Sequence, residues 1–163
     1  MRSAPLQLLQ VAFKKVSVEL DEEHAPKEPS NPFTTIFVFD GIDISTEFGI
    51  GEIDPDHERG RLFLVTLHVI VDNQPLSHVT ERKFSPYLID VEVHGVVVVL
   101  KGAEELAPPE DLAAVNGASL LWAAVREQVL TITSRMLAGP VTLPTMNFHD
   151  LRQASAAEPA VPA

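Results

Sequence analysis

The side chains best suited to metal binding or acid–base chemistry are scattered along this chain. Its six histidines form neither an H-E-x-x-H motif nor a pair at metal-ligand spacing, and there is no cysteine. The densest polar cluster is Asp54, Asp56, His57 and Glu58. Because it lacks the glycine and the spacing of a calcium-binding loop, a solvated acidic turn explains it better than a cation site. The sequence therefore predicts no metal ion and no cofactor.

Catalytic nucleophiles and nucleotide-binding loops are also not indicated. Gly49, Ile50 and Gly51 are only a fragment of a phosphate-binding motif, since neither a helix nor a lysine is expected to follow them. Ser119 and Ser134 lie in predicted helix, without the strained turn that exposes a catalytic serine. We therefore expect a protein that is not an enzyme.

Length and charge narrow the class of protein. A chain of 163 residues that is 45% apolar can fill one core, so we assign residues 1–153 to a single domain and 154–163 to a disordered, Ala/Pro-rich tail. The net charge of -11 opposes binding to nucleic acid or to anionic membranes and favours basic or unfolded polypeptide partners. We expect no signal peptide and no membrane span, which needs about 20 apolar residues, and hence a cytoplasmic protein.

Four segments have the residue pattern of β-strands. Residues 6–20 are rich in β-branched side chains, and apolar residues alternate through 61–72 and 83–100. Residues 33–53 also have strand character, interrupted by glycines that indicate bends or a bulge. The proline-rich residues 21–32 predict a long crossover loop between the first two strands.

The C-terminal third of the chain has helical periodicity. Steps of three and four residues place five apolar side chains along one side of a helix within 115–137: Trp122, Val125, Val129, Ile132 and Met136. Gly139 and Pro140 should end this helix. Pro144 then requires an extended connector, and a second, shorter helix should start near Asn147 or Phe148. Strands followed by helices predict an α+β fold with an antiparallel sheet and helices on one side.

The same region carries an ordered set of motifs: VN-x-A-x-x-L, R-E-x-(V/I) and T-x-R, followed by a glycine-containing break and L-P-x-x-N-F. The residues that match are Val115, Asn116, Ala118, Leu121, Arg126, Glu127, Val129, Thr133, Arg135, Leu143, Pro144, Asn147 and Phe148. This order resembles the SecB family of protein-export chaperones, and residues 7–19 and 61–71 resemble two of its strands. The resemblance implies a four-stranded antiparallel sheet, two helices packed on one side, and a homotetramer built as a dimer of dimers.

Apolar side chains around the crossover predict an interaction surface. Successive strand residues face opposite ways, so half of the apolar residues in 33–39 should fill the core and half should face another chain. The residues alone leave a client groove and an oligomer interface equally open. The resemblance favours the groove, because SecB proteins hold unfolded clients between the sheet, the crossover loop and the last helix. The client-binding residues expected are Phe33, Ile36, Phe37, Val38, Phe39, Val141, Leu143, Met146, Phe148 and Leu151.

A second apolar surface is expected on the long helix. Several apolar residues lie off its main stripe and imply a second packed face: Leu120, Ala123, Ala124, Leu130 and Leu137. Packing of the main stripe on the chain's own sheet needs none of these side chains. By resemblance, this helix forms the oligomer interface of the family, so we assign these residues to it.

The resemblance implies an ATP-independent holdase that hands unfolded clients to the SecA motor. Family members dock SecA through acidic residues on the exposed face of the sheet, of which Glu19 is retained here, whereas Lys15 stands where an aspartate is usual. We therefore expect weaker coupling to SecA. Two alternatives stay open: a SecB-like chaperone dedicated to one partner such as an antitoxin, and a small ligand-binding or enzymatic α+β domain with a pocket beneath Phe37 and Trp122.

Overall fold

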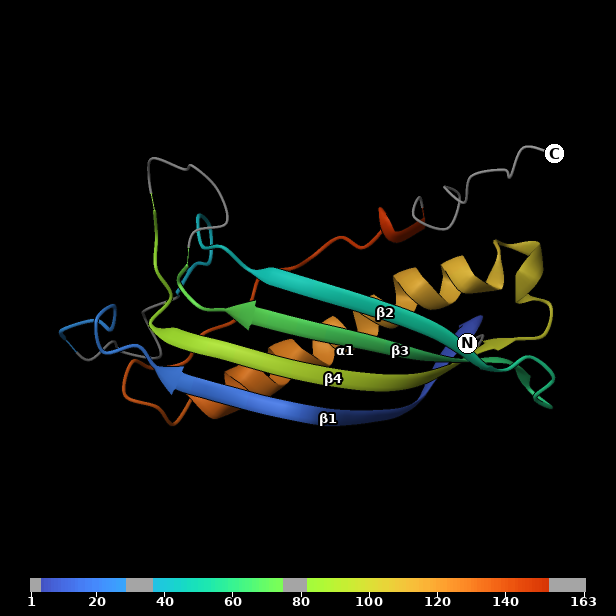
Figure 1. Ribbon diagram of the computed structural model, residues 1–163, viewed down its shortest axis with the longest axis horizontal. Helices are drawn as coiled ribbons and strands as arrows, with labels where there is room; N and C mark the ends of the chain where they lie inside the picture. Colours follow the sequence, from blue (N-terminus) through green and yellow to red (C-terminus); the bar gives the residue numbers. More distant parts are fainter. Residues whose placement is uncertain (1–3, 29–36, 75–81, 153–163) are drawn as a thin grey trace, which may run out of the picture.

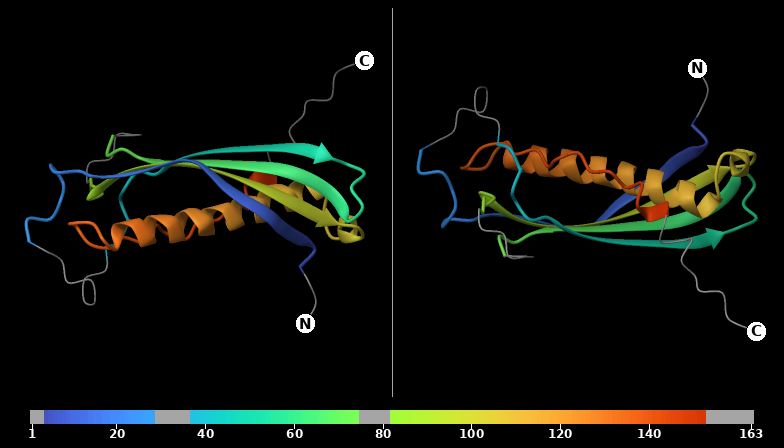
Figure 2. Two further views of the ribbon diagram at one scale, coloured as in Figure 1. Left: turned by 90° about the horizontal axis from the view of Figure 1, so that it is seen from below. Right: turned by 90° about the horizontal axis from the view of Figure 1, so that it is seen from above.

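The computed structural model describes residues 4–28, 37–74 and 82–152. The strands β1 (Leu6–Leu20), β2 (Ser45–Asp54), β3 (Gly60–Val71) and β4 (Tyr87–Leu100) form one antiparallel sheet in the order β1-β4-β3-β2. A short 3-10 helix, η1 (Ala103–Glu105), leads into the long helix α1 (Pro109–Thr133). The helix crosses one face of the sheet, here called the inner face (Figures 1 and 2). The predicted α+β fold with a four-stranded antiparallel sheet is confirmed.

The core lies between α1 and the two central strands. Alternate residues of β4, including Tyr87, Ile89 and Val91, are buried, as alternation in a sheet covered on one face requires. The helix buries its predicted stripe through Trp122, Val125 and Val129, whereas Ile132 and Met136 are only half-buried. Close approach depends on Gly117, since a Cβ there would lie 2.9 Å from Val65 Cγ2. The first three residues of the predicted helical stripe and the alternating residues of β4 therefore meet in one core.

The start of α1 is fixed to the sheet by an ion-pair network. Pro109 occupies the first turn, where its missing N–H costs nothing, and Glu110 lies in the same turn. Arg61 of β3 donates to both carboxylate oxygens of Glu52 on β2, at 2.6 and 2.8 Å, and to Glu110 at 2.7 Å. One guanidinium thus joins two strands to the helix, and its geometry matches the planar fork that favours arginine over lysine.

The helix ends earlier than predicted, at Thr133. The Thr133 hydroxyl is fully buried, donates to the Val129 carbonyl at 2.8 Å and accepts from the Val141 amide at 3.0 Å. Residues 134–138 form turns, and Gly139 has φ 81°, a left-handed conformation that suits glycine. The prediction that the helix continues to residue 137 was therefore wrong for its last turn.

A second helix packed on the sheet is not confirmed. The amides of Leu151 and Arg152 bond to the carbonyls of Phe148 and His149, which makes a turn that becomes helical at residues 151–152. The chain beyond residue 152, including the predicted tail 154–163, lies outside the described residues.

The second strand also starts later than predicted, at Ser45. Residues 37–39 are not in a strand, and residues 33–36 lie outside the described part of the chain. Gly41 has φ 81°, and the Ile42 amide bonds to the Phe39 carbonyl at 3.0 Å, so the backbone turns before β2 can begin. The glycine that indicated a bend within a strand marks the turn that precedes one.

Candidate functional site

The apolar residues of the crossover segment, defined here as residues 37–44, are unequally exposed. Phe39 is buried in the core at 5% exposure, Phe37 is half-buried, and Val38 is 45% exposed. The rings of Phe37 and Phe39 meet edge to face with centroids 5.1 Å apart. Of the crossover residues predicted to bind clients, Phe37 and Val38 are therefore accessible, while Phe33 and Ile36 lie outside the described residues.

The second predicted wall is an extended strap, residues 139–148, that lies against α1. Its alternate side chains Val141 and Leu143 are buried, Leu143 completely, and Phe148 is 9% exposed. The Phe148 ring packs on Trp122 with centroids 6.2 Å apart. These three side chains belong to the core of the folded subunit, whereas Met146 and the following Leu151 are half-buried at its surface.

Side chains of the core hold the backbone of the strap. Tyr87 Oη donates to the Gly139 carbonyl, Arg126 Nε to the Leu143 carbonyl and Trp122 Nε1 to the Pro144 carbonyl, each at 2.8 Å. Burial raises the pKa of Tyr87, which keeps its hydroxyl protonated as a donor. These bonds keep Val141, Leu143 and Phe148 buried, so the predicted client-binding residues that are accessible in the described part of the chain are Phe37, Val38, Met146 and Leu151.

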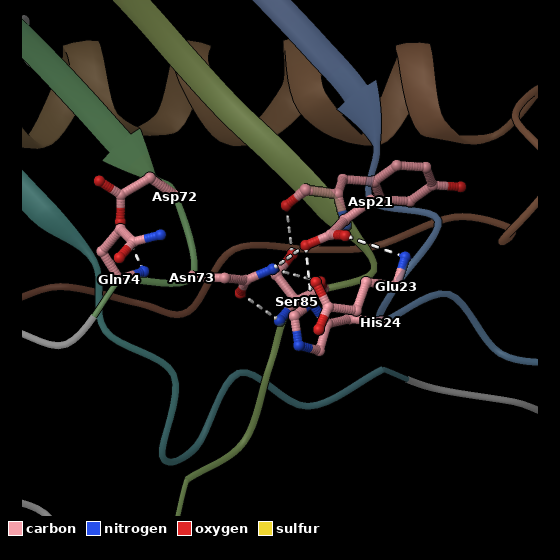
Figure 3. A network of polar contacts seen from close by, with 8 residues as sticks. Asp21, Glu23, His24, Asp72, Asn73, Gln74 and Ser85 are labelled. Atoms are coloured by element: carbon pink, nitrogen blue, oxygen red, sulfur yellow. Dashed lines mark hydrogen bonds and ion pairs between the residues drawn. The ribbon is translucent and has the colours of Figure 1, made fainter.

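A polar hub, formed by residues 21, 24, 73 and 85, joins the chain just after β1 to the hairpin between β3 and β4 (Figure 3). Asn73 Nδ2 donates to Asp21 Oδ2 at 2.7 Å and to the Ser85 carbonyl at 3.0 Å, and His24 Nδ1 lies 2.8 Å from Asp21 Oδ2. The His24 hydrogen bond, more than any other contact, lowers the pKa of Asp21 against the opposing effect of burial. Ser85 Oγ donates to the Tyr87 carbonyl at 2.7 Å, so no serine–histidine pair forms here.

Two surfaces of the subunit leave large apolar side chains uncovered. On α1, Leu120, Ala123 and Leu130 are exposed and Ala124 is half-buried, and Leu137, in the turns that follow the helix, is 86% exposed. Residues 4–6 and the adjoining turn of α1 that contains Leu120 border a hollow of about 240 Å³ with mostly apolar walls. Of the predicted interface residues, Leu120, Ala123 and Leu130 are therefore accessible on the helix, and Leu137 is accessible beyond its end.

The second such surface is the free edge of β1, which sequence reasoning missed. Leu9, Phe13 and Val16 are exposed. Pairing of Phe13 with Val93 and of Val16 with Val91 puts both side chains on the inner face. Two irregularities in the pairing of β1, near Leu9 and at residues 13–15, break its alternation. The partial alternation in the sequence was the only signal of this edge.

The outer face of the sheet carries two ion pairs between β1 and β4. Lys15 Nζ lies 2.5 Å from Asp90 Oδ2, and Lys14 Nζ lies 2.8 Å from Glu92 Oε1. The hydrogen bond from Lys15 is the main cause of the lowered pKa of Asp90, as that from Lys14 is for Glu92. Glu19 is exposed. It lies on the same face, because it pairs with Leu88, which is two residues from Asp90 on β4.

In the polar cluster at the turn between β2 and β3, two side chains accept hydrogen bonds from backbone amides of the same turn. Asp54 Oδ1 accepts from the Asp56 amide at 3.0 Å, and His57 Nδ1 accepts from the Arg59 amide at 3.2 Å. This turn borders a hollow of about 400 Å³ with both acidic and basic walls. Among residues 4–28, 37–74 and 82–152, no three His, Asp or Glu side chains are placed to hold a metal ion. In the same part of the chain, no helix combines the length and apolarity needed to cross a membrane.

Comparison with protein-family models and with curated protein sequences gives no match. Comparison with solved structures finds similarity to the Mycobacterium tuberculosis Rv1957 SecB-like chaperone, solved in complex with a ChAD peptide from the Rv1956 HigA1 antitoxin. The two chains are 20% identical, the match covers 87% of this chain and 91% of that one, and the TM-score is 0.48.

Proposed function

We propose that this protein is an ATP-independent holdase chaperone of the SecB kind, which binds non-native polypeptides and prevents their aggregation. The observation that supports the proposal is the exposure of large apolar side chains on β1, with Leu9, Phe13 and Val16, and on α1, with Leu120 and Leu130. Monomeric proteins rarely expose large apolar side chains in contiguous groups, so such groups mark sites of interaction. Further exposed large apolar side chains lie elsewhere on the molecule: Val38, Ile50, Ile53, Leu64, Leu106 and Leu137.

Client binding is assigned to the crossover and the end of the strap. Phe37 and Val38 supply an aromatic ring and an accessible aliphatic side chain, and Met146 supplies a flexible one that adapts to different clients. Each such contact is weak, and affinity for a long unfolded chain comes from several grooves acting together. The net charge of -11 adds attraction to basic segments of a client.

The remaining apolar surfaces are assigned to assembly as a homotetramer. The exposed side of α1 and the edge of β1 offer two apolar surfaces, and a dimer of dimers needs two different interfaces. Ala123 and Ala124 allow close approach of a second helix between the larger side chains of Leu120 and Leu130. This assembly would also multiply the client grooves on which avidity depends.

Delivery to SecA in the cytoplasm is the family role, and the outer face favours a weaker version of it. Lys15 and Lys14 neutralise Asp90 and Glu92, so the face that would dock a motor through carboxylates is partly compensated. Glu19 is exposed for such docking. This compensation supports the second candidate, a chaperone dedicated to one aggregation-prone partner such as an antitoxin.

The test is suppression of aggregation without nucleotide. A guanidinium-unfolded protein is diluted into buffer with the native chain, with Val38→Glu, or with Gln10→Glu, which adds the same charge on the outer face. The native chain and Gln10→Glu should abolish light scattering near one tetramer per client, and Val38→Glu should require several-fold more protein. Unchanged aggregation with an excess of the native chain would refute the holdase proposal.

A further inference from the structure

Lys83, at the stem of the hairpin that precedes β4, makes three contacts with the crossover segment. Its Nζ donates to the Val38 carbonyl at 2.6 Å and lies 5.3 Å from the centroid of the Phe37 ring. Its backbone amide donates to the Gly41 carbonyl at 3.4 Å. One residue therefore holds the backbone on both sides of the buried Phe39.

These contacts replace strand pairing that the crossover segment lacks. Residues 37–39 are not in a strand, so no neighbouring strand satisfies the Val38 carbonyl. A hydrogen bond from an ammonium group is charge-assisted and stronger than a neutral one. The same ammonium attracts the face of the Phe37 ring, whose edge contact with Phe39 fixes the other side of the aromatic pair.

The residues that follow Lys83 contact the chain just after β1, at Asp21 and His24. The Phe84 ring stacks on His24 with centroids 4.0 Å apart, and Ser85 is joined to Asp21 through Asn73. Both ends of the connection between β1 and β2, residues 21–24 and 37–41, therefore contact the hairpin stem, residues 83–85. Lys83 is the member of this stem that touches the accessible client-side residues.

We propose that Lys83 is a positioning residue for client binding: it sets the backbone of Val38 and the ring of Phe37 in the orientation that a client contacts. This inference rests on the proposed holdase function. Without the lysine, Phe39 would still anchor the segment in the core, but Phe37 and Val38 would sample several orientations. Client binding would then have to supply the ordering that Lys83 now supplies in advance.

The test compares four chains for binding to fluorescently labelled, reduced and carboxamidomethylated lysozyme, a permanently unfolded basic polypeptide. They are the native chain, Lys83→Met, Lys83→Arg and the control Lys101→Met, which removes an exposed lysine at the opposite end of β4. We expect Lys83→Met to weaken binding by about three- to tenfold. Lys83→Arg should restore it, because a guanidinium can donate to a carbonyl and stack on a ring.

Two further measurements separate positioning from general destabilisation. Hydrogen exchange at the amides of Ile42 and residue 83 should be faster in Lys83→Met and normal in Lys83→Arg. In a Phe37→Leu background, Lys83→Met should keep only the part of its effect on binding that acts through the Val38 carbonyl, because the contact with the Phe37 ring is already lost. If Lys83→Met folds poorly, Lys83→Arg still tests the role, because it keeps both contacts and should bind the client as the native chain does.

The outcomes are distinct. Normal client binding or unchanged exchange in Lys83→Met overturns the role of Lys83 and leaves the holdase proposal intact. Equal loss in Lys83→Met and Lys83→Arg also overturns it, since the arginine keeps the proposed contacts. If the native chain does not bind the unfolded lysozyme, the proposed function fails and the client role of Lys83 fails with it.

Discussion

Leu143 is the residue for which the sequence and the structure make opposite predictions. The family motif places it in the client groove, yet its side chain is completely buried against the helix core. A Leu→Ala change at such a position removes buried methyl groups and leaves a cavity, at a cost of about 2–5 kcal/mol. We expect Leu143→Ala to lower the free energy of unfolding by about 3 kcal/mol, because the strap backbone stays bonded and allows only partial collapse.

For a chain of this length, that loss corresponds to a decrease in Tm of about 6–12 °C, at 2–4 °C per kcal/mol. Urea unfolding followed by the fluorescence of Trp122, the single tryptophan, measures it directly. The control is Thr142→Ala, an exposed neighbour whose substitution should change stability by less than about 0.5 kcal/mol. Protein concentration is held constant, because assembly contributes to apparent stability.

Client binding by Leu143→Ala should remain close to that of the native chain when both are measured well below the lower Tm. The opposite result, native stability with lost client binding, would mean that Leu143 faces the client and that the strap is not docked on α1. Loss of both in proportion would indicate that the strap opens during binding.

Three further predictions test the hub, the assembly and the outer face. Because the hydrogen bond from His24 lowers the pKa of Asp21, its carboxylate stabilises the fold above the ordinary carboxyl pKa and stops doing so as the pH falls through the lowered value. Asp21→Asn should therefore be less stable than the native chain at neutral pH, with the difference closing below about pH 4 in urea titrations. Ala124→Glu should split the proposed tetramer by burying an unpaired charge, which light scattering detects as a smaller mass. Lys15→Asp should strengthen binding of the cognate SecA in calorimetry, since it removes the cation that compensates Asp90; no change would argue against docking at this face.

The sheet and the main helix could be predicted from the spacing of their buried side chains. Tyr87, Ile89 and Val91 alternate without interruption, and Trp122 to Val129 follow the helical repeat on the side that faces them. Prediction failed where a single tertiary contact decides the local structure. The helix stops at Thr133 because its hydroxyl bonds to the returning strap, a partner eight residues away in sequence.

The crossover segment shows the same limit. An apolar, aromatic run around Phe37 has high strand propensity, but the turn at Gly41 and the contacts of Lys83 hold it outside the sheet. Strand propensity depends on the local sequence, so it cannot predict a contact with Lys83, which is distant in the chain.

The sequence predicted that the candidate site is apolar, but it did not predict which of its side chains are exposed. The apolar pattern of the strap indicated contact with something apolar, and only the fold shows that Val141 and Leu143 contact the chain's own helix. Phe13 and Val16 were missed because their exposure depends on the position of β1 at the edge of the sheet, beyond the cover of α1.

This protein is proposed to recognise non-native polypeptide through accessible apolar surface. The most direct measurement is titration calorimetry, without nucleotide, of one protein in two states: native lysozyme and its reduced, carboxamidomethylated form. We predict binding of the unfolded form in the micromolar range or tighter, with a negative heat-capacity change from apolar burial, and no binding of the native form. Equal binding of both forms would indicate simple charge attraction, and binding of neither would contradict the chaperone proposal.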